Sequence, residues 1–105
     1  MNQWIVKYHK LALKDMMKLD NSQRKLVLKA IKKVSTNSLP GYRGGYGKPL
    51  KNHKESKLAG YLKITVKNEG LRVIYKLVQK DQNMCILVIG CRSNSEVYKI
   101  AQKRK

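Results

Sequence analysis

The chain has 105 residues, of which 42% are hydrophobic, and its 24 Lys and Arg against 6 Asp and Glu give a net charge of +18. This length fits one hydrophobic core and is too short for two, so we expect a single domain over residues 1–105. The periodic apolar blocks exclude a disordered chain, and because so much positive charge repels itself, we expect an anionic partner: nucleic acid, an acidic protein or a membrane surface.

The first third of the sequence predicts a strand followed by two helices. Residues 3–8 alternate between apolar and polar side chains, which is typical of a strand. A first helix is expected over residues 9–19. Asp20 and Gln23 have the spacing of a capping box and predict that a second helix starts there and ends near Ser35. That helix has an apolar face formed by Val27, Ala30, Ile31 and Val34.

Residues 36–57 break the pattern and predict a loop, because they contain two prolines and four glycines. The loop also carries Tyr42, Arg43, Tyr46, Lys48, Lys51 and Lys54. Basic and aromatic side chains on such a loop could bind RNA through charge and base stacking, with Lys48 and Lys51 as contacts. A polar connector without a binding role explains the same composition.

Three strands and a last helix fill the second half. Residues 58–67 and 71–78 alternate, and 68–70 have the residues of a hairpin turn. Residues 84–90 are apolar on both faces, as expected of a strand with neighbours on both sides. Ser93 and Glu96 have capping-box spacing and predict a helix to the end of the chain. The predicted fold is α+β: two helices on one face of a mainly antiparallel four-stranded sheet, plus a short C-terminal helix.

Five side chains of the second half are expected on the other, open face of this sheet: Lys63, Lys67, Arg72, Arg92 and Tyr98. The cations repel one another unless an anion lies between them, and the arginine fork matches a phosphate. The start of the last helix adds further N–H donors for an anion. For RNA, this set could stabilise attack of a 2′-OH on the adjacent phosphate. A basic docking face without catalysis is the alternative.

Several classes of site and partner are not expected. No apolar run approaches the roughly 20 residues of a membrane-spanning helix, so we expect no membrane partner. The start of the chain has no signal-peptide pattern. His9 and His53 are far apart and lack acidic neighbours, so neither a metal nor a cofactor is predicted. Cys85 and Cys91 do not form a CxxC pair, which indicates reduced cysteines and a cytoplasmic protein.

Four segments, GKPLKN, GYLKITV, LRVIYKL and IGCRSNSEVYKIA, resemble the RelE/ParE superfamily of toxins from type II toxin–antitoxin pairs, and most closely its RelE branch. The resemblance covers residues 47 to about 103. It implies a metal-independent endoribonuclease that enters the ribosomal A site, contacts ribosomal RNA and cleaves mRNA there. It also implies a cognate antitoxin as partner.

The resemblance also implies roles for single residues. Lys63 matches a general base, Arg72 and Arg92 match arginines that stabilise the transition state, and Tyr98 matches a tyrosine that stacks on or orients the substrate. RelE-like toxins often have a second basic residue two positions after the lysine, where this chain has Thr65. Lys67 lies on the same face, so Thr65 and Lys67 are expected to contact RNA.

Two other functions remain as alternatives. One is a ParE-like toxin that inhibits DNA gyrase by binding and cuts nothing. The other is a non-catalytic basic RNA-binding module. ParE-type toxins do not need the set of Arg72, Arg92 and Tyr98, which argues against the first. Double-stranded-RNA-binding domains begin with a helix, whereas this chain begins with a strand and two helices. This difference argues against an RNA-binding module of that type.

Overall fold

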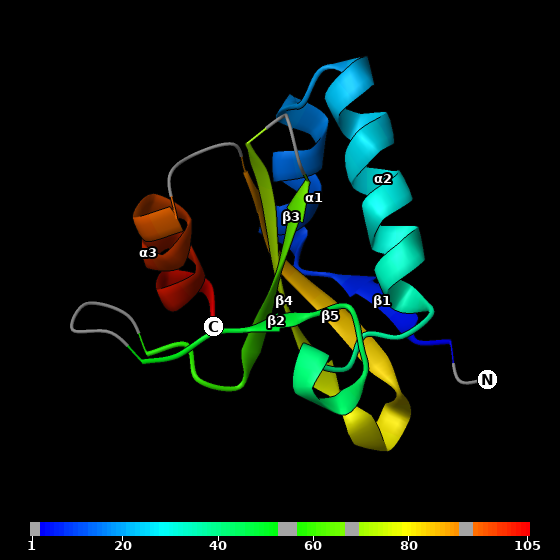
Figure 1. Ribbon diagram of the computed structural model, residues 1–105. Helices are drawn as coiled ribbons and strands as arrows, with labels where there is room; N and C mark the ends of the chain where they lie inside the picture. The colour runs from blue at the N-terminus through cyan, green and yellow to red at the C-terminus, as the bar shows by residue number, and fades with distance from the viewer. Residues whose placement is uncertain (1–2, 53–56, 67–69, 91–93) are drawn as a thin grey trace.

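The structure is a computed structural model, and it describes residues 3–52, 57–66, 70–90 and 94–105. Its elements are β1 (Ile5–Tyr8), α1 (Lys10–Lys18), α2 (Asn21–Ser35), β2 (Lys48–Pro49), β3 (Tyr61–Val66), β4 (Leu71–Val78), β5 (Asn83–Gly90) and α3 (Asn94–Arg104), with single 3-10 turns at Gly41–Arg43 and Gln79–Asp81. The strands form one mixed sheet in the order β1-β5-β4-β3-β2 (Figure 1). In it, β1 is parallel to β5 and the other pairs are antiparallel.

The predicted α+β class is confirmed, but the sheet has five strands where the sequence predicted four. The additional strand is β2, whose two residues pair with Leu62 and Lys63 of β3. Both residues of β2 are exposed, Gly47 precedes them and the second one is a proline, so they give no periodic signal. The strand exists because β3 offers backbone partners, and no local propensity predicts that.

Helices α1 and α2 cover one face of the sheet, as predicted. The His9 imidazole caps α1 by accepting the Leu11 N–H at 3.1 Å. The capping box of α2 is present: the Gln23 N–H donates to the Asp20 carboxylate at 2.8 Å, and the Asp20 N–H donates to the Gln23 side chain at 3.3 Å. The main core lies between these helices and the sheet and includes Val27, Ile31, Val34, Ile64, Val73 and Met84.

The sequence predicted that the opposite face of the sheet is open. This prediction is wrong, because α3 packs on part of that face (Figure 1). The register of β4 against β5 shifts so that Ile74 faces Val88 and Tyr75 faces Ile86. Leu87 is the extra residue, and both Leu87 and Val88 join a second core. Val97 and Ala101 of α3 are fully buried in that core. The uncovered part of this face includes Thr65, which is exposed, and Lys63, which is half-buried.

The predicted start of one strand is wrong, and several other predictions fall outside the described residues. The strand expected from Leu58 begins at Tyr61, because Gly60 has a φ of +93° and the Tyr61 N–H turns back to the Leu58 carbonyl at 3.0 Å. The turn at 68–69, Cys91 and the Ser93 cap lie outside the described residues. Across the described parts of the chain, no helix is long and apolar enough to span a membrane.

The glycine-rich loop after α2 is a tightly hydrogen-bonded turn at residues 37–47. The Gly41 N–H donates to the Gly47 carbonyl at 2.8 Å, and the Tyr46 N–H donates to the Asn37 carbonyl at 3.0 Å. The Tyr75 hydroxyl, fully buried under the loop, donates to the Ser38 carbonyl at 2.8 Å. A Cβ at Gly47 would overlap that hydroxyl. The loop is therefore fastened to the core of the sheet through Tyr75.

We predict that Tyr75→Phe lowers the free energy of unfolding by about 1–3 kcal/mol, because the buried Ser38 carbonyl loses its side-chain donor. Burial also raises the pKa of the Tyr75 phenol above its ordinary value of 10.0. The unfolded phenol ionises above that pH while the folded one keeps its proton, so this stabilisation is present below pH 10 and is lost as the pH rises further. Urea unfolding at pH 8 and at about pH 10.5 measures both effects.

The wild type should lose more stability between the two pH values than the variant. Tyr8, whose pKa burial also raises, is common to both proteins and cancels in the comparison. An equal loss in both proteins would contradict the assignment to Tyr75.

Candidate functional site

Lys63 and Tyr98 form the centre of the candidate site. They come from β3 and from the second turn of α3, and are 35 residues apart in sequence. The Lys63 Nζ donates to the Tyr98 hydroxyl at 3.2 Å and lies 5.7 Å from the centre of its ring. Both side chains are half-buried. An ammonium group and a phenol thus meet at the boundary between the sheet and α3, where a ligand can reach both.

Arg72 lies on β4 in the same region of the sheet. Its neighbours across the sheet are Thr65 on β3 and Gly90, the last residue of β5. The Arg72 Nη1 donates to the Gly70 carbonyl at 2.8 Å. Because Arg72 is opposite Thr65 and Lys63 is two residues earlier on β3, the two cations lie diagonally across one strand pair.

The other predicted site residues fall into three groups. Lys48 is brought to the site, because it pairs directly with Lys63 across β2 and β3. Lys51 is exposed on the segment that leaves the sheet after β2. Arg92 and Lys67 lie outside the described residues, although the strand ending at Gly90, two residues before Arg92, is placed beside Arg72.

A second partly buried cluster, which the sequence analysis missed, holds α3 on the sheet. The Arg104 guanidinium donates hydrogen bonds to the Asp15 carboxylate of α1 at 2.7 Å and to the Leu87 carbonyl at 3.0 Å. Asp15 also accepts the Ile89 N–H at 3.0 Å, just past the end of the β1 pairing. The exposed fractions of the Arg104 and Asp15 side chains are 14% and 13%. Two oppositely charged residues 89 positions apart give no local signal in the sequence.

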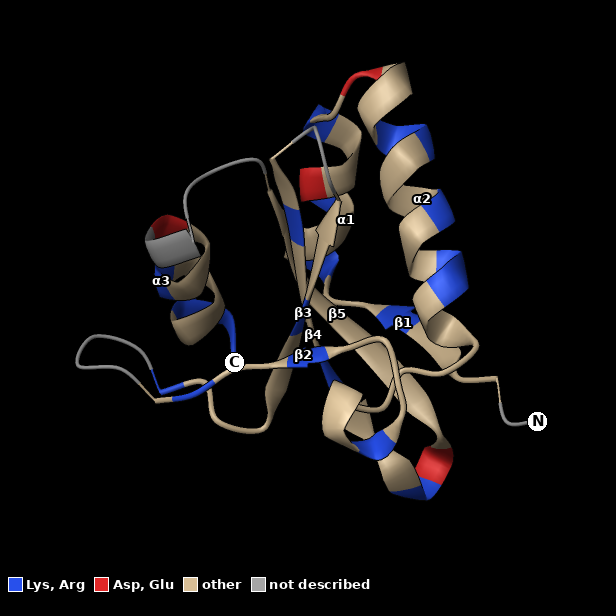
Figure 2. Ribbon diagram, in the orientation of Figure 1, with Lys and Arg blue, Asp and Glu red and all other residues tan. Residues whose placement is uncertain are grey.

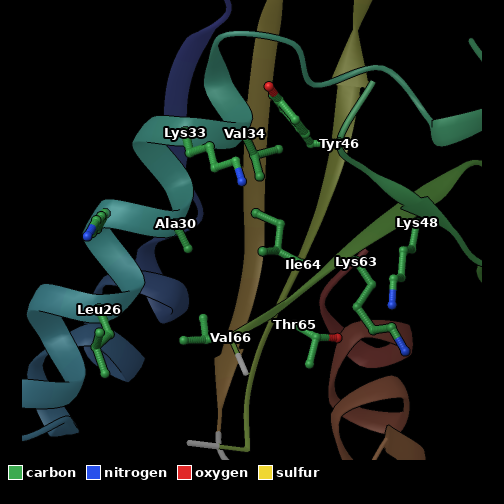
Figure 3. A pocket seen from close by; sticks show the side chains of 11 residues that line it. Leu26, Ala30, Lys33, Val34, Tyr46, Lys48, Lys63, Ile64, Thr65 and Val66 are labelled. Carbon is green, nitrogen blue, oxygen red and sulfur yellow. The ribbon is translucent and has the colours of Figure 1, made fainter. Parts of the chain in front are cut away.

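A groove of about 540 Å³ lies between α2 and β3, and its lining includes Lys63 and Thr65 (Figure 3). Ile64 and Val66 point into the groove toward α2, whereas Lys63 and Thr65 point toward α3. Lys29, Lys33 and Lys48 line it together with Tyr46. Basic residues therefore lie on both sides of β3, and the side chains that line this groove include no acidic one.

Basic residues lie on all three helices and acidic ones are few (Figure 2). Among the described residues, no three His, Cys, Asp or Glu side chains are close enough together to hold a metal ion. The chemistry available around Lys63 is therefore that of cations, a phenol and a hydroxyl. Such a set binds phosphate and stabilises negative charge.

The fold is that of the RelE toxins. An arginine-to-alanine double mutant of the E. coli toxin RelE in the free state matches with a TM-score of 0.76 at 21% identity, covering 98% of each chain. The RelE of an archaeal RelE–RelB complex from Pyrococcus horikoshii matches with a TM-score of 0.61 at 19% identity, over 89% of this chain and 99% of that one.

An E. coli protein described as a putative RelE-like toxin is 27% identical over 100 residues, which is 94% of either chain. No family model matches. The predicted resemblance to the RelE/ParE superfamily, and within it to the RelE branch, is thus confirmed over nearly the whole chain.

We predict that Arg104→Met loosens α3 and lowers the free energy of unfolding by about 1–3 kcal/mol, because Asp15 loses a charged partner. Hydrogen exchange should become faster at the amides of α3 and at Ile89. The matched control is Lys103→Met, which removes one exposed positive charge from the neighbouring position. Equal exchange in both variants would show that the ion pair does not hold the helix.

Proposed function

We propose that this protein is the toxin of a type II toxin–antitoxin pair and acts as a ribosome-dependent endoribonuclease on mRNA. The observation that carries the proposal is the contact between Lys63 and Tyr98, with Arg72 and Lys48 on the neighbouring strands. The toxin assignment draws on the similarity to the putative RelE-like toxin and on the shared fold.

The proposed reaction uses the RNA's own 2′-OH as nucleophile. Lys63 acts as the general base and takes the 2′-OH proton as the oxygen attacks the adjacent phosphorus. The bond to the 5′-oxygen breaks, which leaves a 2′,3′-cyclic phosphate and, after protonation, a 5′-OH end. Arg72 stabilises the negative charge on the phosphorane oxygens. Arg92 has the role that the resemblance implies, in charge stabilisation or protonation of the leaving group, and Tyr98 orients the substrate.

Thr65 stands where RelE-like toxins often have a second basic residue, so the proposed site has one cation fewer at this position. Its hydroxyl lies opposite Arg72 and can donate a hydrogen bond to a phosphate oxygen, but it adds no charge. Lys48 of β2 pairs with Lys63 of β3 and places a further cation beside it. We infer that Lys48 takes over part of the electrostatic task of the missing basic residue.

The proposed partners are the ribosomal A site and a cognate antitoxin. With a net charge of +18, the chain needs anionic surfaces to offset its self-repulsion, and both ribosomal RNA and an acidic antitoxin meet this need. Solved complexes of fold relatives pair RelE with RelB, as in E. coli and Pyrococcus horikoshii. A cytoplasmic location follows from the proposed ribosomal target.

Purified protein added to translating ribosomes should cut the message, and primer extension should map the new ends. Arg92→Ala and Lys63→Ala should each lower cleavage by orders of magnitude, whereas Lys14→Ala, an exposed lysine on α1, should not. Circular dichroism controls for folding. Intact message together with inhibited gyrase supercoiling would favour the ParE-like alternative, and binding to RNA without cleavage would favour the non-catalytic one.

The affinity for single-stranded RNA should fall steeply with salt, with a log–log slope of about −0.7 per phosphate contacted, because bound counterions are released. Lys48→Gln should make the slope less steep by about one contact's share, and Lys14→Gln should leave it unchanged. Titration of a non-cleavable 2′-O-methyl oligonucleotide at several salt concentrations measures this. A flat salt dependence would mean that the positive charge serves the antitoxin alone.

A further inference from the structure

The turn at residues 40–47 exposes two tyrosines that the proposed reaction does not use. The Tyr42 side chain is 80% exposed and the Tyr46 side chain 52% exposed. Aromatic side chains of this size dominate buried cores and interfaces, because their rings offer a large apolar surface. Here two tyrosines within five residues are exposed to solvent, and Arg43 lies between them. This arrangement indicates a binding surface.

The backbone of the turn that holds them is fixed by hydrogen bonds and close packing. It forms hydrogen bonds within itself and to residues 37 and 39, and the segment that leads into it accepts a hydrogen bond from the Tyr75 hydroxyl at the Ser38 carbonyl. Gly45 packs so closely that a Cβ there would overlap the Leu39 backbone. The two rings are thus presented on a preorganised support, so binding a ligand costs little ordering of the chain.

Each tyrosine lines a hollow that also has at least one basic residue in its lining. Tyr42 and Arg43 line a hollow of about 300 Å³ together with Pro49, Leu77 and Gln79. Tyr46 lines the 540 Å³ groove, and the Lys33 Nζ lies 5.1 Å from the centre of its ring (Figure 3). The lining residues of both hollows include no acidic side chain. Flat aromatic faces with cations and one amide match a nucleobase and its phosphate.

The turn also lies close to the candidate site. Tyr46 is two residues before Lys48, and Lys48 pairs directly with Lys63. At about 3.3 Å per residue along a strand and roughly 5 Å between paired strands, the path from Tyr46 to Lys63 is about 12 Å. One RNA strand can span that path.

We propose that the 40–47 turn is a stacking platform for single-stranded RNA, on which Tyr42 and Tyr46 each hold one base of a strand that continues to Lys63. This inference rests on the proposed function for the identity of the RNA as substrate. Arg43 and Lys48 contact the backbone phosphates, and the amide of Gln79 contacts a base edge, because an amide both donates and accepts hydrogen bonds.

The test is a titration of two 2′-O-methyl oligonucleotides of equal length, one with bases and one abasic. Tyr42→Ala is expected to weaken binding of the base-containing strand about 5- to 150-fold, equivalent to the roughly 1–3 kcal/mol of one base stacked on an aromatic ring. The same variant should bind the abasic strand as the wild type does. Tyr42→Phe keeps the ring and should bind within twofold of the wild type.

Tyr46→Ala should behave like Tyr42→Ala. The matched control is Met17→Ala, which removes a 75% exposed apolar side chain from α1 and should change neither affinity. Unchanged binding in Tyr42→Ala and Tyr46→Ala, or an equal loss on the abasic strand, would overturn the platform and leave an acidic protein as the ligand of this surface.

Cleavage by the wild type on ribosomes is measured separately. If the wild type cleaves while base-dependent binding is absent, only the platform fails. If base-dependent binding is present and the wild type does not cleave, the proposed nuclease fails and the turn remains an RNA-binding surface.

Discussion

The candidate site depends on the docking of α3 against the sheet. A helix of 11 residues is marginal by itself in water, so its stability comes from the face that it buries. Val97 is fully buried, which contributes about 1.5–3 kcal/mol. The Arg104–Asp15 ion pair then fixes the far end of the helix to α1. Between these two attachments lies Tyr98, and its contact with Lys63 exists only while the helix is docked.

The extra residue Leu87 in β5 is what makes this docking surface. In a strand of regular register, Leu87 and Val88 would point to opposite faces of the sheet, because side chains alternate along a strand. With the extra residue, both belong to the core under α3, while Met84, Ile86 and Ile89 remain in the core under α1 and α2. One strand thereby supports two hydrophobic cores, and the carbonyl of the extra residue accepts a hydrogen bond from Arg104.

The positive charge is distributed so that the fold tolerates it. Most lysines of α2 lie on the exposed side of the helix, and the Arg24 side chain satisfies carbonyls at the end of α1, including that of Leu19 at 2.8 Å. The cations at the candidate site lie on the sheet, on paired strands, where their backbones are fixed by hydrogen bonds. The sheet therefore holds these cations close together in spite of their repulsion, and their combined positive potential attracts an anion.

The sequence alone determined the elements whose signals are local: the capped helix α2, the alternating strand β3, the hairpin partner β4 and the apolar strand β5. It also placed Lys63, Thr65 and Arg72 on one region, because strand alternation and one turn suffice for that.

The tertiary structure decided the features that depend on contacts between distant residues. These are the two-residue strand β2 that brings Lys48 to Lys63, the closing of the second face by α3, and the Asp15–Arg104 pair across 89 positions. The same holds for the glycine-rich loop, whose composition fits a flexible connector. Its shape is fixed by backbone hydrogen bonds within the loop and by the hydrogen bond from Tyr75 of β4, and no pattern within the loop predicts the contact with Tyr75.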